Sequence, residues 1–197
     1  LGLFEATGET DYLAHAQHWV KIANRHYWDE DAGGYFFAAD DTSGLITRTK
    51  SANDNAVPSG NGVLANVCAR LYFLTGDNAY YQNSEAIITA FSGALKTNFF
   101  PLSTLVNSAE FLRSALQIVI VATHTDAATL TRAVYDLSLP NKLVSIIPPG
   151  TALPASHPAH GKGQIEGAPT AYVCRGPVCS QPVLTPAELS QNLLATP

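Results

Sequence analysis

The stretch from Trp28 to Asn61 has the sequence WDEDAGGYFFAADDTSGLITRTKSANDNAVPSGN, and it decides how this chain is interpreted. It lies between two segments with helical periodicity, 12–23 and 64–74. Connections between neighbouring helices usually take about two to eight residues, so a connection this long needs a reason. Binding and disorder are the usual reasons, and the aromatic residues argue against disorder. We therefore expect a folded loop that carries function.

The helical segments around this loop repeat one pattern. Apolar residues recur at steps of three and four in 12–23, 64–74, 87–95 and 105–115, which predicts amphipathic helices. Thr7-Gly8-Glu9-Thr10 resembles Thr75-Gly76-Asp77-Asn78, and each stretch follows an apolar helix end. A glycine can close a helix in the left-handed conformation, and the residues after it can cap the next helix. Two such corners favour stacked or ring-closed helical hairpins.

The pattern changes after residue 115. Two β-branched runs, 117–122 and 142–147, flank a capped helix expected over 126–137, which is typical of a parallel βαβ unit. A Pro/Gly-rich loop follows at 148–169, then a possible third strand at 170–174 and a last helix ending near Leu194. The fold class is therefore mainly α, with helical hairpins over 1–116 and a small α/β extension over 117–197.

Composition excludes several classes of protein. The 197 residues include 11 basic and 16 acidic side chains without a basic stripe, so we expect no nucleic-acid partner. The apolar runs are too short for a membrane span, and no signal peptide is evident, so we expect a cytoplasmic protein without a membrane partner. His15 and His18 lie three apart and could bind a metal, but no Cys or carboxylate partner has recognisable spacing, so solvated helix histidines are favoured, and nothing implies a cofactor. We expect no metal.

The start of the chain is also informative. No methionine occurs in the sequence, and residues 1–6 resemble the end of a helix that began earlier. We expect the C-terminal piece of a longer protein. The alternative is a complete domain from which a tag was removed.

The 33–61 region holds the candidate site. Tyr35 to Ala38 and Leu45 to Arg48 predict a β-hairpin between the helices. Aromatic faces beside charged groups suit a sugar or another polyhydroxylated ligand. In the alternative interpretation the loop is a structural cap in which Arg48 pairs with Asp54. The candidate catalytic residues are Asp54 and His26, and the candidate ligand-binding residues are Tyr35, Phe36, Arg48, Lys50, Asn55, Ser59 and Asn61.

The three cysteines divide into one and two. Cys68 falls on an apolar stripe and is expected in the core. Cys174 and Cys179 form a CxxxxC pair that matches neither a thioredoxin-like CxxC nor a full zinc set. The pair could be two reduced structural thiols, a disulfide, or part of a metal site completed elsewhere.

Several motifs together resemble one known family. They include Gly33-Gly34-Tyr35-Phe36, Pro58-Ser59-Gly60-Asn61, Leu74-Thr75-Gly76-Asp77 and the tail with Tyr172-Val173-Cys174 and Cys179. From about residue 7 to its end, the chain resembles the spermatogenesis-associated protein 20 family of thioredoxin-domain-containing proteins. The resemblance implies an N-terminal thioredoxin-like domain followed by an (α/α) toroid similar to N-acylglucosamine 2-epimerases and six-hairpin glycosidases. This chain would be the last part of that toroid plus the tail.

The resemblance also implies a function and partners. It favours a carbohydrate-binding or carbohydrate-active toroid, epimerase- or glycosidase-like, with a small saccharide as ligand. The alternative is a non-catalytic binding or scaffold domain of a redox-related protein, or a thiol or metal role for Cys174 and Cys179. The expected partners are the missing N-terminal hairpins and the thioredoxin-like domain of the same protein. A partial ring would expose apolar helix faces, so a homo-oligomer is also expected.

Overall fold

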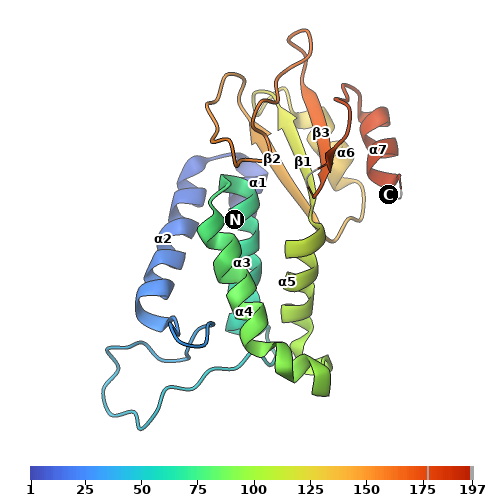
Figure 1. The fold of residues 1–197 in the computed structure, drawn as a ribbon. Coiled ribbons are helices and arrows are strands. Elements are labelled where there is room, and N and C mark those ends of the chain that lie inside the picture. Colours follow the sequence, from blue (N-terminus) through green and yellow to red (C-terminus); the bar gives the residue numbers. More distant parts are fainter. Residues whose placement is uncertain (177, 196–197) are drawn as a thin grey trace. The chain divides into compact units, whose positions relative to one another are not determined.

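The computed structural model describes residues 1–176 and 178–195, and it is mainly helical with a small α/β part (Figure 1). The chain divides into two compact units. The helical unit contains residues 11–72 and 77–113, together with Leu1. The α/β unit contains the chain from residue 114 onward and also takes up residues 2–10 and 73–76. The expected division after residue 116 followed chain order and did not anticipate these two short additions.

The helical unit is built from the predicted helices. They are α2 (Thr10–Tyr27), α3 (Gly60–Thr75), α4 (Asn78–Thr97) and α5 (Ser103–Ser114), with a 3-10 turn, η1 (Phe100–Leu102), before α5. Side-chain oxygens cap two of the starts. Ser59 Oγ accepts from the Gly62 N–H at the start of α3, and Asp77 accepts from the Ala79 N–H at the start of α4.

The apolar stripes of these helices meet in the core of the helical unit. Ile87 of α4 and Leu105 of α5 are fully buried with Ala65 of α3, and Tyr35 from the long segment joins them. Cys68 is fully buried beside Val20 and Leu71, as predicted, and burial raises the pKa of its thiol to about 12. None of the described helices has the length and apolar content needed to cross a bilayer.

The predicted parallel βαβ unit is confirmed in the α/β unit. Strand β1 (Leu116–Val121) pairs in parallel with β2 (Lys142–Ile147), and α6 (Ala128–Tyr135) connects them. Strand β3 (Thr170–Arg175) pairs antiparallel with β1, so the sheet order is β2-β1-β3-β4. The two-residue strand β4 (Val178–Cys179) was not predicted, and α7 (Pro186–Leu194) is the predicted last helix.

Strand β1 is covered on both faces. Ile118 and Ile120 pack with Leu130 of α6 and Leu189 of α7, whereas Val119 and Val121 pack with Ala159 of the 148–169 loop. A strand buried on both faces is continuously apolar, which explains the run QIVIVA.

The two predicted glycine corners are confirmed, and both belong to the α/β unit. Gly8, which follows α1 (Gly2–Thr7), has φ 72°, and Gly76 has φ 73°. A Cβ on Gly8 would lie 3.0 Å from the His124 ring, and one on Gly76 would lie 2.8 Å from the His157 backbone. Each corner therefore needs glycine both for its backbone conformation and for close approach.

The predicted β-hairpin at 35–48 is wrong. The described residues form only an isolated bridge between Trp28 and Tyr35 in this region. Some backbone groups find side-chain partners in place of a second strand: the Tyr35 N–H and C=O bond to Asn61, and the Ala38 C=O bonds to Arg48. Others find single backbone partners, such as the Phe37 N–H, which donates to the Thr49 carbonyl. The segment is therefore an ordered irregular loop.

Candidate functional site

Part of the predicted site lines a cleft in the helical unit. The cleft has a volume of about 290 Å³ and lies where the 35–37 segment meets α2 and α3. Tyr35, Phe36 and Asn61, which were predicted to bind a ligand, are among its walls. The remaining walls are Ala23, Tyr27, Phe37, Gly60 and Leu64. The cleft is thus mainly aromatic.

Asn61 holds the loop against the start of α3. Its side-chain oxygen accepts from the Tyr35 N–H at 2.7 Å, and its Nδ2 donates to the C=O groups of Tyr35 and Ser51 at 2.9 Å. The side chain is almost fully buried, and these bonds engage the amide oxygen and both amide hydrogens. Asn61 therefore shapes the cleft wall and has little capacity left for a ligand.

Arg48 and Lys50 are anchors within the same segment. The Arg48 guanidinium donates to the His26 and Ala38 carbonyls at 2.8 Å and lies over the Phe36 ring at 4.3 Å. Lys50 Nζ donates to the Asp29 carboxylate at 2.6 Å and to the Gly33 carbonyl. The Lys50 hydrogen bond lowers the pKa of Asp29, so this half-buried pair stays ionised. Both cations bind backbone carbonyls.

Asp54 joins the starts of two helices. One carboxylate oxygen accepts from the Ser59 N–H at 2.8 Å before α3, and the other accepts from the Thr104 N–H at 2.7 Å in the first turn of α5. Burial raises the pKa of Asp54, but the hydrogen bonds from Thr104 and Ser59 outweigh it and the net shift is downward. The carboxylate is therefore a stable anion that acts as a helix cap.

His26 lies beside two aspartates. Its Nδ1 is 2.9 Å from an Asp40 carboxylate oxygen, and the hydrogen bond from His26 lowers the pKa of Asp40. Possible ligand atoms of His26, Asp40 and Asp41 lie within 4.8 Å of one another, so this group could hold a metal ion. Both aspartates are exposed, and acidic side chains often gather at a surface without a metal. Asn55, the remaining predicted residue, is also exposed.

The structure thus separates the predicted site residues into two groups. Tyr35, Phe36 and Asn61 come together at the cleft, whereas Arg48, Lys50 and Asp54 each anchor a different part of the segment. The pairing of Arg48 with Asp54, which belonged to the alternative interpretation, is replaced by these separate contacts. Two aromatic walls were missed. Phe37 follows Phe36 directly, so the aromatic run itself was the available signal, and Tyr27 closes the preceding helix.

The cysteine pair lies in the α/β unit. Cys174 of β3 stands opposite Cys179 of β4 in the antiparallel register, with their Cα atoms 3.9 Å apart. The two sulfurs form a disulfide bond. Among the alternatives left open by the sequence, the structure contains the disulfide.

Comparison with known proteins supports the resemblance. No family model matches the chain. Spermatogenesis-associated protein 20 of Homo sapiens is 31% identical over 98% of this chain, and the proteins of that name from Rattus norvegicus and Mus musculus are 28% and 27% identical over the same share. In each case the chain spans 25% of the relative's length. We therefore identify the chain as a homologue of the C-terminal part of the spermatogenesis-associated protein 20 family.

Proposed function

We propose that the helical unit binds a small saccharide in its aromatic cleft and does not itself catalyse a reaction on it. The observation that carries this proposal is the aromatic lining, in which Tyr27, Tyr35, Phe36 and Phe37 wall a space of about 290 Å³. This volume is near the lower limit of ligand pockets, which begin at about 300 Å³. One sugar ring therefore suits the cleft better than an extended chain.

Aromatic rings offer flat apolar faces for the C–H face of a sugar. Phe37 is 64% exposed although it lines the cleft, so its ring is accessible to a ligand. Phe36 is backed by the Arg48 guanidinium at 4.3 Å, which holds the ring in place. A ring that is already fixed loses little conformational entropy on binding.

Polar contacts are available where α3 begins. Gly60, the first residue of α3, lines the cleft. The first turn of a helix carries backbone N–H groups without acceptors inside the helix. Ser59 already accepts from the Gly62 and Val63 N–H groups. The N–H groups of Gly60 and Asn61 are therefore the ones that suit a ligand hydroxyl oxygen. The cleft thus combines apolar stacking faces with a few directed donors, as ligand sites commonly do.

The charged groups near the cleft are hydrogen-bonded within the protein, and this favours a binding role over a catalytic one. A general acid or base must be able to exchange its proton with a substrate. Both Asp54 oxygens accept from backbone N–H groups of the protein, and the lowered pKa keeps the group ionised. His26 is not among the residues that line the cleft in the described part of the chain. Neither candidate catalytic residue is therefore placed to act on a ligand there.

The proposal extends to the surrounding protein. We propose that the helical hairpins belong to an (α/α) toroid similar to N-acylglucosamine 2-epimerases and six-hairpin glycosidases, completed by earlier hairpins of the same protein. The partners are then the N-terminal hairpins and a thioredoxin-like domain. Association of the chain with copies of itself is the alternative way to cover the apolar helix faces.

The test is to titrate the full-length protein with mono- and disaccharides and to measure binding by isothermal titration calorimetry. Phe37→Ala is expected to weaken binding about fivefold, since loss of one stacking face removes on the order of 1 kcal/mol. Phe99→Ala is the matched control, because Phe99 is equally exposed at 66% but lies outside the cleft. Absence of saccharide binding, or equal weakening by both variants, would overturn the proposal.

A thiol function is the second candidate, favoured by the disulfide. Cys179 is partly exposed next to the short β3–β4 connection, whereas Cys174 is buried. A dithiol reductant would attack the accessible sulfur of Cys179, release the Cys174 thiolate, and leave two cysteine thiols after a second exchange. Thiol titration of the native protein before and after treatment with a thioredoxin-type dithiol tests this. A disulfide that resists the dithiol until the protein unfolds would rule the function out.

A further inference from the structure

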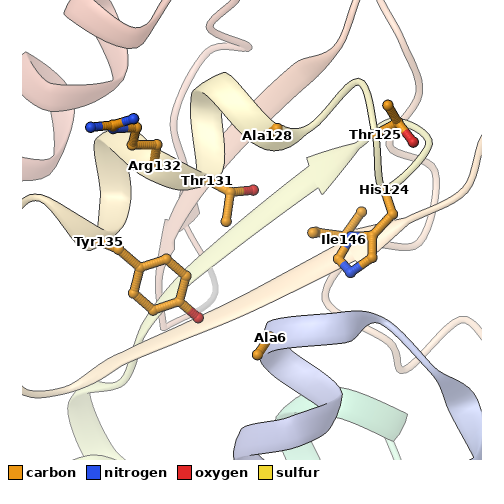
Figure 2. A pocket seen from close by; sticks show the side chains of 8 residues that line it. All are labelled: Ala6, His124, Thr125, Ala128, Thr131, Arg132, Tyr135 and Ile146. Carbon is orange, nitrogen blue, oxygen red and sulfur yellow. The ribbon is translucent and has the colours of Figure 1, made fainter.

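A second cleft lies in the α/β unit, outside the site described above. It has a volume of about 490 Å³ and runs along α6 (Figure 2). Thr131, Arg132 and Tyr135 of α6 form one side, His124 and Thr125 follow β1, and Ile146 comes from near the end of β2. The cleft is thus beside the carboxyl ends of two parallel strands. Open α/β sheets generally bind ligands outside these strand ends.

His124 is an exposed residue at one end of the cleft. Its ring lies against Gly8, where even a single added carbon would approach Nε2 to 3.0 Å. Gly8 has φ 72°, a backbone conformation that favours glycine, and its lack of a side chain lets the ring lie close to the corner after α1. Figure 2 shows the ring beside Ile146, on the side of the cleft where α1 lies. The imidazole therefore lines the cleft at this end.

Thr131 is the unusual residue of this cleft. Its hydroxyl oxygen is buried, and it is the one such side-chain atom without a hydrogen-bond partner in the part of the chain that the structure describes. A threonine inside a helix usually bonds back to a carbonyl one turn earlier. Buried polar atoms almost always find a partner, so an orphaned one calls for an explanation. Figure 2 shows Thr131 between Tyr135 and His124, over the strands.

The charges around the cleft favour an anion. The lining includes the Arg132 guanidinium, the His124 imidazole and the Tyr135 phenol, and it contains no carboxylate. The Arg132 guanidinium is 4.0 Å from Asp136, but both side chains are largely exposed. Such a surface ion pair is weak, so Arg132 is able to turn toward a ligand. Two neighbouring acids have their own donors: Glu5 accepts from the Val144 N–H and Asp126 from the Thr123 hydroxyl.

We propose that this cleft binds a small molecule bearing a carboxylate or phosphate group. The Thr131 hydroxyl, which is buried in the unliganded protein, turns about its χ1 bond toward the cleft and donates to an oxygen of that group, and Arg132 supplies the balancing charge. Tyr135 and His124 fix the orientation of the remainder of the molecule. The orphaned hydroxyl is satisfied only in the bound state.

The test compares two threonines of α6. Inorganic phosphate, glycerol 3-phosphate and succinate are titrated into the full-length protein at constant ionic strength and followed by calorimetry. Thr131→Val keeps the shape of the side chain and removes the hydroxyl, and we expect it to weaken binding about tenfold without lowering the melting temperature of the unliganded protein. Thr129→Val is the matched control, because Thr129 is exposed on the same helix and does not line the cleft. Arg132→Gln is expected to weaken binding further, with a smaller dependence on salt.

The outcomes are separable. Preference for glycerol 3-phosphate and inorganic phosphate assigns the site to phosphates, and preference for succinate assigns it to carboxylates. A fall in melting temperature on Thr131→Val without ligand would show that the hydroxyl has a structural partner, which overturns the proposal. Binding of none of the three anions at millimolar concentration would overturn it as well. Saccharide binding in the helical unit is measured separately, so the two proposals stand or fall independently.

Discussion

Two long connecting segments, 28–59 in the helical unit and 148–169 in the α/β unit, are each held by one buried polar side chain. Asn61 ties the first segment through the backbone of Tyr35 and Ser51. His157 ties the second: its Nε2 lies 2.8 Å from the Leu74 carbonyl, and its Nδ1 accepts from the Ala159 N–H at 3.0 Å. Both side chains are at most 5% exposed.

The difference between the two ties is chemical. The side-chain amide of Asn61 does not titrate. The His157 ring does, and it must be neutral here, since a protonated Nδ1 could not accept from the Ala159 N–H. Most polar side chains of a long segment form hydrogen bonds with backbone groups. Only side chains without such a partner are available to bind a ligand. By this criterion the polar atoms of Arg48, Lys50 and Asp54 already have partners within the protein, whereas the Thr131 hydroxyl has none among the residues that the structure describes.

The largest effect is expected when the hydrogen bonds of Asn61 are removed. Asn61→Ala removes the partner of two buried backbone groups and one partly buried group, so we expect the free energy of unfolding to fall by about 3 kcal/mol. Denaturant unfolding at neutral pH measures this loss.

Asn55→Ala is the matched control, because Asn55 is exposed in the same segment. It is expected to change the free energy of unfolding by less than about 0.5 kcal/mol. Equal effects from the two variants would show that the segment is not held by Asn61.

The next largest effect is expected from the hydrogen bonds of His157. His157→Leu removes two hydrogen bonds from the 148–169 segment, and we expect a loss of about 2 kcal/mol in the free energy of unfolding. The residue lines no part of the aromatic cleft, so saccharide affinity should not change.

The pH dependence of the free energy of unfolding distinguishes the contribution of His157 from that of Asn61. Burial lowers the pKa of His157 below its usual value of 6.5, and the charges of Lys162 and His160 act in the same direction, although the hydrogen bond to Leu74 opposes them. The unfolded chain therefore binds the proton first as pH falls. The stabilisation is complete above pH 6.5 and declines as the pH drops from there toward the lowered pKa of the folded state. His157→Leu should lack this decline, whereas Asn61→Ala should retain it.

Much of the fold could be predicted from local patterns. The run QIVIVA, the helix after it and KLVSII specified a parallel βαβ unit, and the glycines at 8 and 76 specified two helix corners. These signals are local because they depend on periodicity and on backbone conformation. Strand β4 was missed because two residues after a turn carry no periodicity.

The site was harder to predict for a physical reason. Residue type suggested that Arg48, Lys50 and Asp54 face a ligand, but most of their actual partners are backbone groups distant in sequence, such as the Thr104 N–H for Asp54. The false β-hairpin has the same cause, since Asn61 satisfies Tyr35 from 26 positions away. The orphaned state of the Thr131 hydroxyl likewise depends on its surroundings, which no motif encodes.

The most direct test of the central claim, that the polar residues of 28–61 hold the loop and the aromatic residues hold the ligand, is a paired measurement on Asp54→Asn. The variant keeps one acceptor oxygen and loses the other, so either the Ser59 N–H or the Thr104 N–H loses its acceptor. We predict that the free energy of unfolding falls by about 1 kcal/mol while the folded full-length protein keeps its saccharide affinity within about twofold. Unchanged stability with a tenfold or greater loss of saccharide affinity would contradict the account.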